Sequence, residues 1–167
     1  MNLYVIRHGE AGAIGGGVQR DADRPLTDRG KSDALLLGQL LGHLDPVVRL
    51  ILCSPYIRAR QTADAVAAGL LTAAPVQETD HLSPGFRPKP LLEELQALAP
   101  DGSAVVIGHQ PDLSMFLAYV IEGESAASIA MAPCGIAKVK FDSGPTSDAV
   151  LQWLLSPDVI RQLLPPR

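Results

Sequence analysis

The chain has 167 residues, of which 47% are hydrophobic and only 4% aromatic, and its formal net charge is −4. This length suits one well-cored domain, so residues 1–167 are predicted to form a single domain with an aliphatic core. A weakly acidic chain offers no broad nucleic-acid surface, so any anion site must be local. No apolar run approaches the ~18 residues of a membrane span, which favours a cytoplasmic monomer without membrane contact.

The cysteines and the histidines do not form a metal-ligand pattern. Cys53 and Cys134 are far apart in sequence, and Cys53 continues an apolar run, so two buried free thiols are expected. His43 and His81 have no partners at ligand spacing. No metal site is predicted.

The first apolar run, residues 3–6, ends at Arg7, His8 and Gly9. A brief run rich in β-forming residues that stops at polar residues and glycine is typical of a buried strand in a parallel sheet. In such sheets ligands bind in the crevice outside the carboxyl ends of the strands. Arg7 and His8 are therefore candidate site residues.

The segment that follows contains four glycines, including Gly12 and Gly17, and shows no apolar periodicity. Residues 11–23 are predicted to form a loop, and a nucleotide-cradling role is not favoured because neither the G-x-G-x-x-G nor the P-loop spacing is present. The function of this glycine loop is left open. Thr27 is expected to cap a helix with an apolar inward face.

A second buried strand is predicted over residues 47–53, and Ser54-Pro55 is expected to end it and begin a helix. Arg58 then falls in the first helical turn. The positive end of the helix dipole and an arginine together favour an anion there. Arg60 is expected to be solvated.

The third buried strand, residues 104–107, ends at Gly108-His109 and is followed by a helix that begins near Pro111. It repeats the design of the first strand, so His109 is the third candidate. Between the second and third buried strands the pattern predicts a short strand over residues 75–78, a loop over residues 80–90 and a helix carrying the leucines of residues 91–98.

Near the C-terminus, residues 135–141 and 149–155 are separated by turn residues and are predicted to form an antiparallel pair at one edge of the sheet. Trp153 is interpreted as a packing residue, and Ser156-Pro157 as the start of a short helix. The predicted fold is α/β, a three-layer sandwich with a mostly parallel central sheet, helices on both faces and this antiparallel edge.

Three strand ends thus present two arginines and two histidines to one rim, a combination suited to a tetrahedral dianion. Four motifs carry a resemblance: Arg7-His8-Gly9, Arg24-Pro25-Leu26-Thr27 with Gly30, the stretch of residues 54–63, and Gly108-His109. In this order they resemble the histidine phosphatase superfamily, with a phosphoglycerate-mutase-like fold. The short chain and the tail of residues 153–157 look most like its small phosphohistidine phosphatase branch, the SixA type.

The resemblance implies that His8 is the nucleophile and becomes phosphohistidine, that Arg7 and Arg58 bind the phosphoryl oxygens, and that His109 adds a hydrogen bond to them. The chemistry of the residues agrees, because a neutral imidazole is nucleophilic near pH 7 and guanidinium groups offset charge on phosphoryl oxygens. No metal or cofactor is implied. The implied substrate is a protein phosphohistidine involved in signal transduction, and phosphate is the product.

The general acid is the point at which this chain departs from the pattern. Larger members with ester substrates use an acidic residue on an inserted segment, and here only a short loop lies at that place. Glu10, Asp80 and His81 are candidates, as are Asp21 and Asp23 near the first strand. Two other functions stay open: a phosphomonoesterase for a small metabolite, and a module that binds phosphate or a phosphoprotein without turnover.

Overall fold

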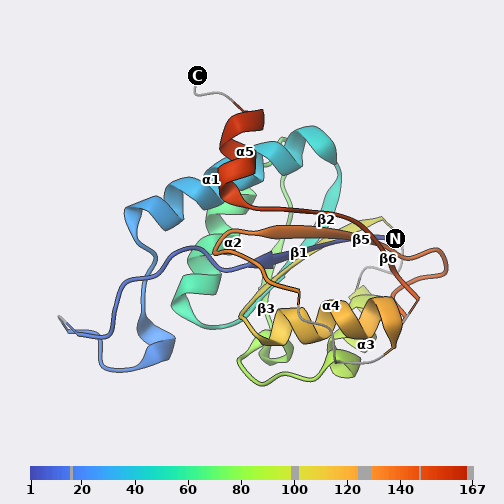
Figure 1. The fold of residues 1–167 in the computed structure, drawn as a ribbon, viewed down its shortest axis with the longest axis horizontal. Helices are drawn as coiled ribbons and strands as arrows, with labels where there is room; N and C mark the ends of the chain where they lie inside the picture. The colour runs from blue at the N-terminus through green and yellow to red at the C-terminus, as the bar shows by residue number, and fades with distance from the viewer. Residues whose placement is uncertain (16, 99–101, 124–128, 147, 165–167) are drawn as a thin grey trace.

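The computed structural model describes residues 1–15, 17–98, 102–123, 129–146 and 148–164. These residues form one mixed sheet with helices on both of its faces (Figure 1). The strands are β1 (Asn2–Arg7), β2 (Val48–Cys53), β3 (Val76–Glu78), β4 (Ser103–Gly108), β5 (Ile136–Lys140) and β6 (Val150–Leu155). The helices are α1 (Asp28–Leu44), α2 (Ile57–Gly69), α3 (Pro88–Leu98), α4 (Asp112–Glu122) and α5 (Pro157–Leu163), with short 3-10 turns η1 (Asp21–Asp23) and η2 (Asp80–Leu82).

The strand order in the sheet is β3-β2-β4-β1-β5-β6. β1 and β2 both pair in parallel with β4, and β3 pairs in parallel with β2. β5 and β6 are antiparallel and form one edge. The predicted mostly parallel sheet with an antiparallel C-terminal edge is therefore confirmed, and the carboxyl ends of β1, β2 and β4 lie at the same rim.

Helices α1, α2 and α5 cover one face of the sheet, while α3 and α4 cover the other (Figure 1). Each face has its own apolar core, built mainly from aliphatic side chains as the composition indicates. Aromatic packing is local: Trp153 lies 6.0 Å from Tyr4 between ring centroids, in agreement with its interpretation as a packing residue. The central strands are packed between these two cores, which fixes the positions of the residues at the strand ends.

Two glycines of α1 permit backbone approaches that a side chain would block. A Cβ added to Gly38 would lie 2.2 Å from the carbonyl oxygen of Val66 in α2, and one added to Gly30 would lie 2.3 Å from that of Glu10. Thr27 caps the helix as predicted, since its Oγ1 accepts a hydrogen bond from the Gly30 nitrogen at 3.0 Å. The start of α1 is thereby pressed against the segment that follows His8.

Two local expectations are corrected. α2 begins at Ile57 rather than at Ser54-Pro55, because the chain bends at Pro55 and Tyr56, and Tyr56, the N-cap, still has an extended conformation. Residues 80–90 are not all loop, since η2 lies within them and α3 starts at Pro88. Arg60 is exposed as predicted, and its guanidinium forms surface ion pairs with Glu78 and Asp64.

Cys53 and Cys134 are buried free thiols, as expected, and burial raises the pKa of each to about 12. The predicted loop of residues 11–23 is irregular over its described residues up to Arg20, apart from isolated bridges at Ala11, Gly15 and Val18, but it ends in η1. Gly16 lies outside the described residues. Among the described helices, none is both long and apolar enough to cross a membrane.

Candidate active site

The backbone of the parallel strands brings the predicted site residues to one rim of the sheet. Arg7 is the last residue of β1, and the nitrogen of His8 donates a hydrogen bond to the Gly108 carbonyl at 3.0 Å. The nitrogen of Ser54, just past β2, donates to the Ile107 carbonyl at 3.0 Å. Strand pairing thus extends to the chain segments that carry His8, Arg58 and His109, and these side chains are in contact.

The imidazole of His8 is held in one orientation. Its Nδ1 donates a hydrogen bond to the Gly9 carbonyl at 2.8 Å, and because a carbonyl only accepts, the ring proton is assigned to Nδ1. Nε2 therefore keeps its lone pair and accepts a hydrogen bond from Arg58 Nε at 3.2 Å. Burial, with the nearby arginines adding to it, lowers the pKa of His8 to about 4, so the ring is neutral near pH 7.

The guanidinium of Arg58 is the centre of the cluster and is only 5% exposed. Its Nε faces His8, and its Nη2 donates to His109 Nδ1 at 3.3 Å. On its other side, Nη1 donates to the backbone carbonyl of Asp21 at 2.6 Å and Nη2 donates to Asp21 Oδ2 at 2.8 Å. The location of Arg58 in the first turn of α2 agrees with the sequence prediction.

His109 is 3% exposed and lies beside His8, with 5.0 Å between ring centroids. Because a guanidinium can only donate, Nδ1 of His109 is the acceptor in this state and its Nε2 donates to Ser54 Oγ at 2.9 Å. Burial first, and then its charged and ionisable neighbours, lower the pKa of His109 to about 3. The Tyr56 ring packs against it in a T-shaped arrangement, with 5.0 Å between ring centroids.

Arg7 supplies a donor that no described residue uses. Its Nη1 donates to the Met131 carbonyl at 2.7 Å, which anchors the guanidinium, but its Nε is buried without a hydrogen-bond partner in the described part of the chain. Leaving a buried donor unpaired costs about 1–3 kcal/mol. Such a donor next to His8 is suited to an anionic ligand that would pair with it.

Taken together, the cluster offers a neutral nucleophilic nitrogen on His8 that is hydrogen-bonded to the Arg58 guanidinium, and the charge of Arg7 acts on both histidines. The N–H···N contacts of Arg58 with His8 and His109 are long, at 3.2 and 3.3 Å, and a phosphoryl oxygen is a stronger acceptor than a ring nitrogen. Within the described residues, no three His, Cys, Asp or Glu side chains gather as metal ligands would. The arrangement fits phosphoryl transfer to a nitrogen nucleophile.

Of the five candidate acids, Asp21 is hydrogen-bonded to Arg58 within the cluster, Asp23 pairs with the exposed Arg20, and the other three lie outside. Glu10 accepts a hydrogen bond from Thr27 Oγ1 at 3.1 Å. The Nδ1 of His81 pairs with Glu94 Oε2 at 2.9 Å, and Asp80 lines a hollow of about 340 Å³ at the ends of β2 and β3. Over the described ranges, none of the three has a hydrogen bond to Arg7, His8, Arg58 or His109.

The sequence did not assign the two residues that hold the cluster from outside. Asp21 was considered only as an acid, yet it clamps Arg58, and Ser54 was interpreted as a helix start, yet its hydroxyl binds His109. For Asp21, the available sequence signal is its spacing from Arg24, because oppositely charged residues three positions apart on one turn can form a pair. No local pattern distinguishes Ser54.

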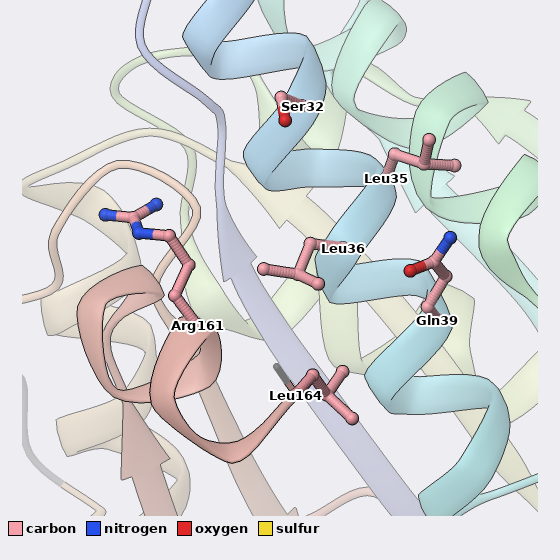
Figure 2. A pocket seen from close by; sticks show the side chains of 6 residues that line it. All are labelled: Ser32, Leu35, Leu36, Gln39, Arg161 and Leu164. Atoms are coloured by element: carbon pink, nitrogen blue, oxygen red, sulfur yellow. The ribbon is translucent and has the colours of Figure 1, made fainter. Parts of the chain in front are cut away.

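A separate hollow of about 330 Å³ lies between α1 and α5, where Leu36 and Leu164 sit between the two helices (Figure 2). Its charged lining residue is Arg161, and that guanidinium pairs with Asp33 and Asp158. The other lining residues are three leucines, Ser32 and Gln39, so this hollow has no group of reactive residues like that at the rim of the sheet.

Comparison with known proteins also indicates a phosphatase. The family model of the histidine phosphatase superfamily (branch 1) matches residues 3–83. An uncharacterized protein of Picosynechococcus is 37% identical over 138 residues, which are 81% of this chain and 82% of that protein. Phosphohistidine phosphatase SixA of Escherichia coli is 28% identical over 159 residues, 94% of each chain.

Solved structures agree with these relatives. The protein histidine phosphatase SixA complexed with tungstate superimposes with a TM-score of 0.84 at 26% identity, covering 96% of this chain and 99% of that one. An alpha-ribazole phosphatase from Shigella flexneri, at 21% identity, covers 94% of this chain and 97% of that one with a TM-score of 0.75, and shares the fold.

The fold, the site and these comparisons define the class of the protein: it is an α/β phosphatase. More specifically, the chain belongs to the histidine phosphatase superfamily.

Proposed function

We propose that this phosphatase removes phosphate from a phosphohistidine on a partner protein, through a covalent phosphohistidine intermediate on His8. The observation that carries the proposal is the orientation of His8. Its Nδ1 proton is engaged by Gly9, so the lone pair of Nε2 points at Arg58. Arg7, whose charge also acts on His8, keeps an unpaired buried Nε donor in the described part of the chain. A nucleophile and two cationic donors thus surround one position for a phosphorus atom.

In the first step, His8 Nε2 forms a bond to phosphorus while the bond from phosphorus to the substrate imidazole breaks, and the departing nitrogen takes a proton from water. In the second step, water attacks phosphorus and releases a proton to the hydroxide left by the first step, the bond to Nε2 breaks and phosphate leaves. Arg7 and Arg58 offset the charge on the phosphoryl oxygens in both transition states. The low pKa of His8 keeps Nε2 unprotonated at neutral pH.

His109 needs a proton on Nδ1 to donate to a phosphoryl oxygen, although that atom accepts from Arg58 in the resting state. The Ser54 hydroxyl makes this exchange possible, because it can accept from Nε2 of His109 or donate to it. When a phosphoryl oxygen takes over the Arg58 donor, a proton on Nδ1 of His109 completes the set of hydrogen bonds to the substrate.

The carboxyl hydrogen-bonded within the cluster is that of Asp21, and its bonds to Arg24 and Arg58 lower its pKa and keep it ionised. The described cluster therefore shows no carboxylic acid able to give a proton to the leaving group, which favours phosphohistidine as the substrate. An alkoxide leaving group is strongly basic, and general acid catalysis typically contributes ~10²–10⁴-fold to its departure. An imidazole leaves far more readily, because its conjugate acid has a pKa of about 6.5. Among the relatives, SixA of Escherichia coli carries the name phosphohistidine phosphatase, which supports the same class of substrate.

The test is a comparison of kcat/KM for a phosphohistidine protein, p-nitrophenyl phosphate and an alkyl phosphate such as a sugar or glycerate phosphate, in one buffer. We expect the phosphohistidine protein to be the best substrate and p-nitrophenyl phosphate to exceed the alkyl phosphate. Equal or better turnover of the alkyl phosphate would reject the proposal and favour a small-metabolite phosphomonoesterase. No phosphate release from any substrate would favour a binding module.

A further inference from the structure

We infer that Asp21, with Arg24 behind it, is a positioning residue that fixes the guanidinium of Arg58 for phosphoryl transfer. The inference rests on the proposed role of Arg58 as a phosphoryl ligand. Asp21 holds Arg58 twice, through its backbone carbonyl at 2.6 Å from Nη1 and its carboxylate at 2.8 Å from Nη2. Asp21 lies in η1, within the loop whose function the sequence left open.

The two edges of the Arg58 guanidinium have different partners. The Nη1 and Nη2 edge is occupied by Asp21, while the Nε and Nη2 edge faces the ring nitrogens of His8 and His109. A planar guanidinium with one edge fixed cannot rotate without breaking two short hydrogen bonds. Asp21 therefore determines the direction in which the opposite edge presents its donors, and that edge faces the nucleophile.

A second arginine holds Asp21 itself. Arg24 Nη1 donates to Asp21 Oδ1 at 2.9 Å, so the two carboxylate oxygens bind different guanidinium groups. Arg24 Nε in turn donates to the Gly12 carbonyl at 2.6 Å. The chain of contacts runs from Gly12 through Arg24 and Asp21 to Arg58, and gives the segment between β1 and α1 a role at the site.

The contacts of Asp21 argue against two other roles, that of a proton donor and that of a group that blocks the anion site. Hydrogen bonds from Arg24 and Arg58 lower the pKa of the Asp21 carboxyl, so it is ionised at neutral pH and is unsuited to be a proton donor. It also does not occupy the Nε of Arg58 or the unpaired Nε of Arg7. An anion bound at those two donors and at His8 therefore does not have to displace it.

The experiment measures kcat and KM with p-nitrophenyl phosphate for Asp21→Asn, Asp21→Ala and the control Asp23→Asn. The control removes the same charge from the same turn, but Asp23 pairs with the exposed Arg20 and not with Arg58. We expect kcat to fall about 10- to 100-fold in Asp21→Ala, a cost in the range of misplacing a catalytic group. KM should change less than threefold, Asp21→Asn should be intermediate, and the control should stay within twofold of wild type.

A double-mutant cycle with Arg58→Ala separates positioning from a general effect on the fold. If Asp21 acts through Arg58, adding Asp21→Ala to Arg58→Ala should lower kcat by less than twofold. The same loss in both backgrounds would overturn the inference, as would wild-type kcat in Asp21→Ala or a gain in activity from unblocking the site. A greater loss on an alkyl phosphate than on p-nitrophenyl phosphate would also overturn it, because that pattern indicates an acid.

The assay does not use phosphohistidine, so the result is independent of the substrate preference proposed above. If the phosphoryl group is transferred to a residue other than His8, the proposed mechanism fails while the coupling between Asp21 and Arg58 can still be measured. If the cycle shows no coupling, the positioning role fails and the proposed function is untouched.

Discussion

Replacement of Arg58 by alanine removes the donors that face the nucleophile. Its Nε and Nη2 lie 3.2 and 3.3 Å from the ring nitrogens of His8 and His109. When substrate is bound, phosphoryl oxygens would replace these ring nitrogens as the acceptors. Loss of one preorganised donor for developing charge costs ~10²–10³ in kcat. Because the two donors belong to one group and their effects do not add fully, we expect Arg58→Ala to lower kcat/KM by about 10³.

The matched variant Arg58→Lys distinguishes geometry from charge. A lysine keeps the positive charge but has no planar fork, so it cannot hold Asp21 with one edge and face His8 with the other. We expect it to recover at most tenfold of the activity lost in Arg58→Ala. The fold should persist in both variants, because Asp21 keeps its ion pair with Arg24 when Arg58 is removed.

The assay is steady-state release of p-nitrophenol, with tungstate affinity and thermal unfolding measured on the same preparations. Tungstate binding should weaken in parallel with kcat/KM, while Tm shifts little. If Arg58→Ala stays within tenfold of wild type, or if Arg58→Lys is fully active, the fork of Arg58 does not bind the transferred phosphoryl group.

Three further predictions concern metal, pH and packing. Dialysis against EDTA should leave activity unchanged, because side chains supply both the nucleophile and the charge compensation; a loss that zinc or magnesium restores would contradict this. The ring protons of His8 and His109, followed by NMR, should show no titration between pH 5.5 and 8, since burial lowers their pKa values to about 4 and about 3; midpoints near 6.5 would disprove it. The unfolded chain takes up these protons near pH 6.5, so the free energy of unfolding should fall as the pH drops from about 6.5 towards 4. Gly30→Ala should destabilise the fold by about 1–3 kcal/mol and lower activity, because the added Cβ meets the Glu10 backbone beside the site; unchanged urea unfolding and kcat would argue against this contact.

The central part of the site was predictable because it depends on strand ends. Apolar runs that stop at Arg7-His8 and at Gly108-His109 are visible in the sequence, and the direct parallel pairing of β1 with β4 brings their ends to one rim. The location of Arg58 followed from the start of a helix. Hydrophobic periodicity and turn residues were thus sufficient to predict the fold class, the antiparallel edge and the positions of these side chains along the elements.

The remainder depends on contacts that periodicity does not encode. Asp21 lies in a 3-10 turn within a segment without apolar spacing, and it reaches Arg58 across 37 positions of the chain. Ser54 was assigned to a helix start because Pro55 follows it, whereas it lies between β2 and α2 and its hydroxyl is hydrogen-bonded to His109. In both cases tertiary packing, rather than local propensity, decides the partner of a polar side chain.

The most direct test of the account is to trap the phosphoenzyme by rapid quench with a labelled phosphohistidine protein and to map the label. The account predicts a single acid-labile, base-stable phosphoramidate on His8, formed and lost at rates consistent with turnover, and no label and no turnover in a folded His8→Ala variant. Label on another residue, an acid-stable adduct, or near wild-type rates in His8→Ala would contradict it.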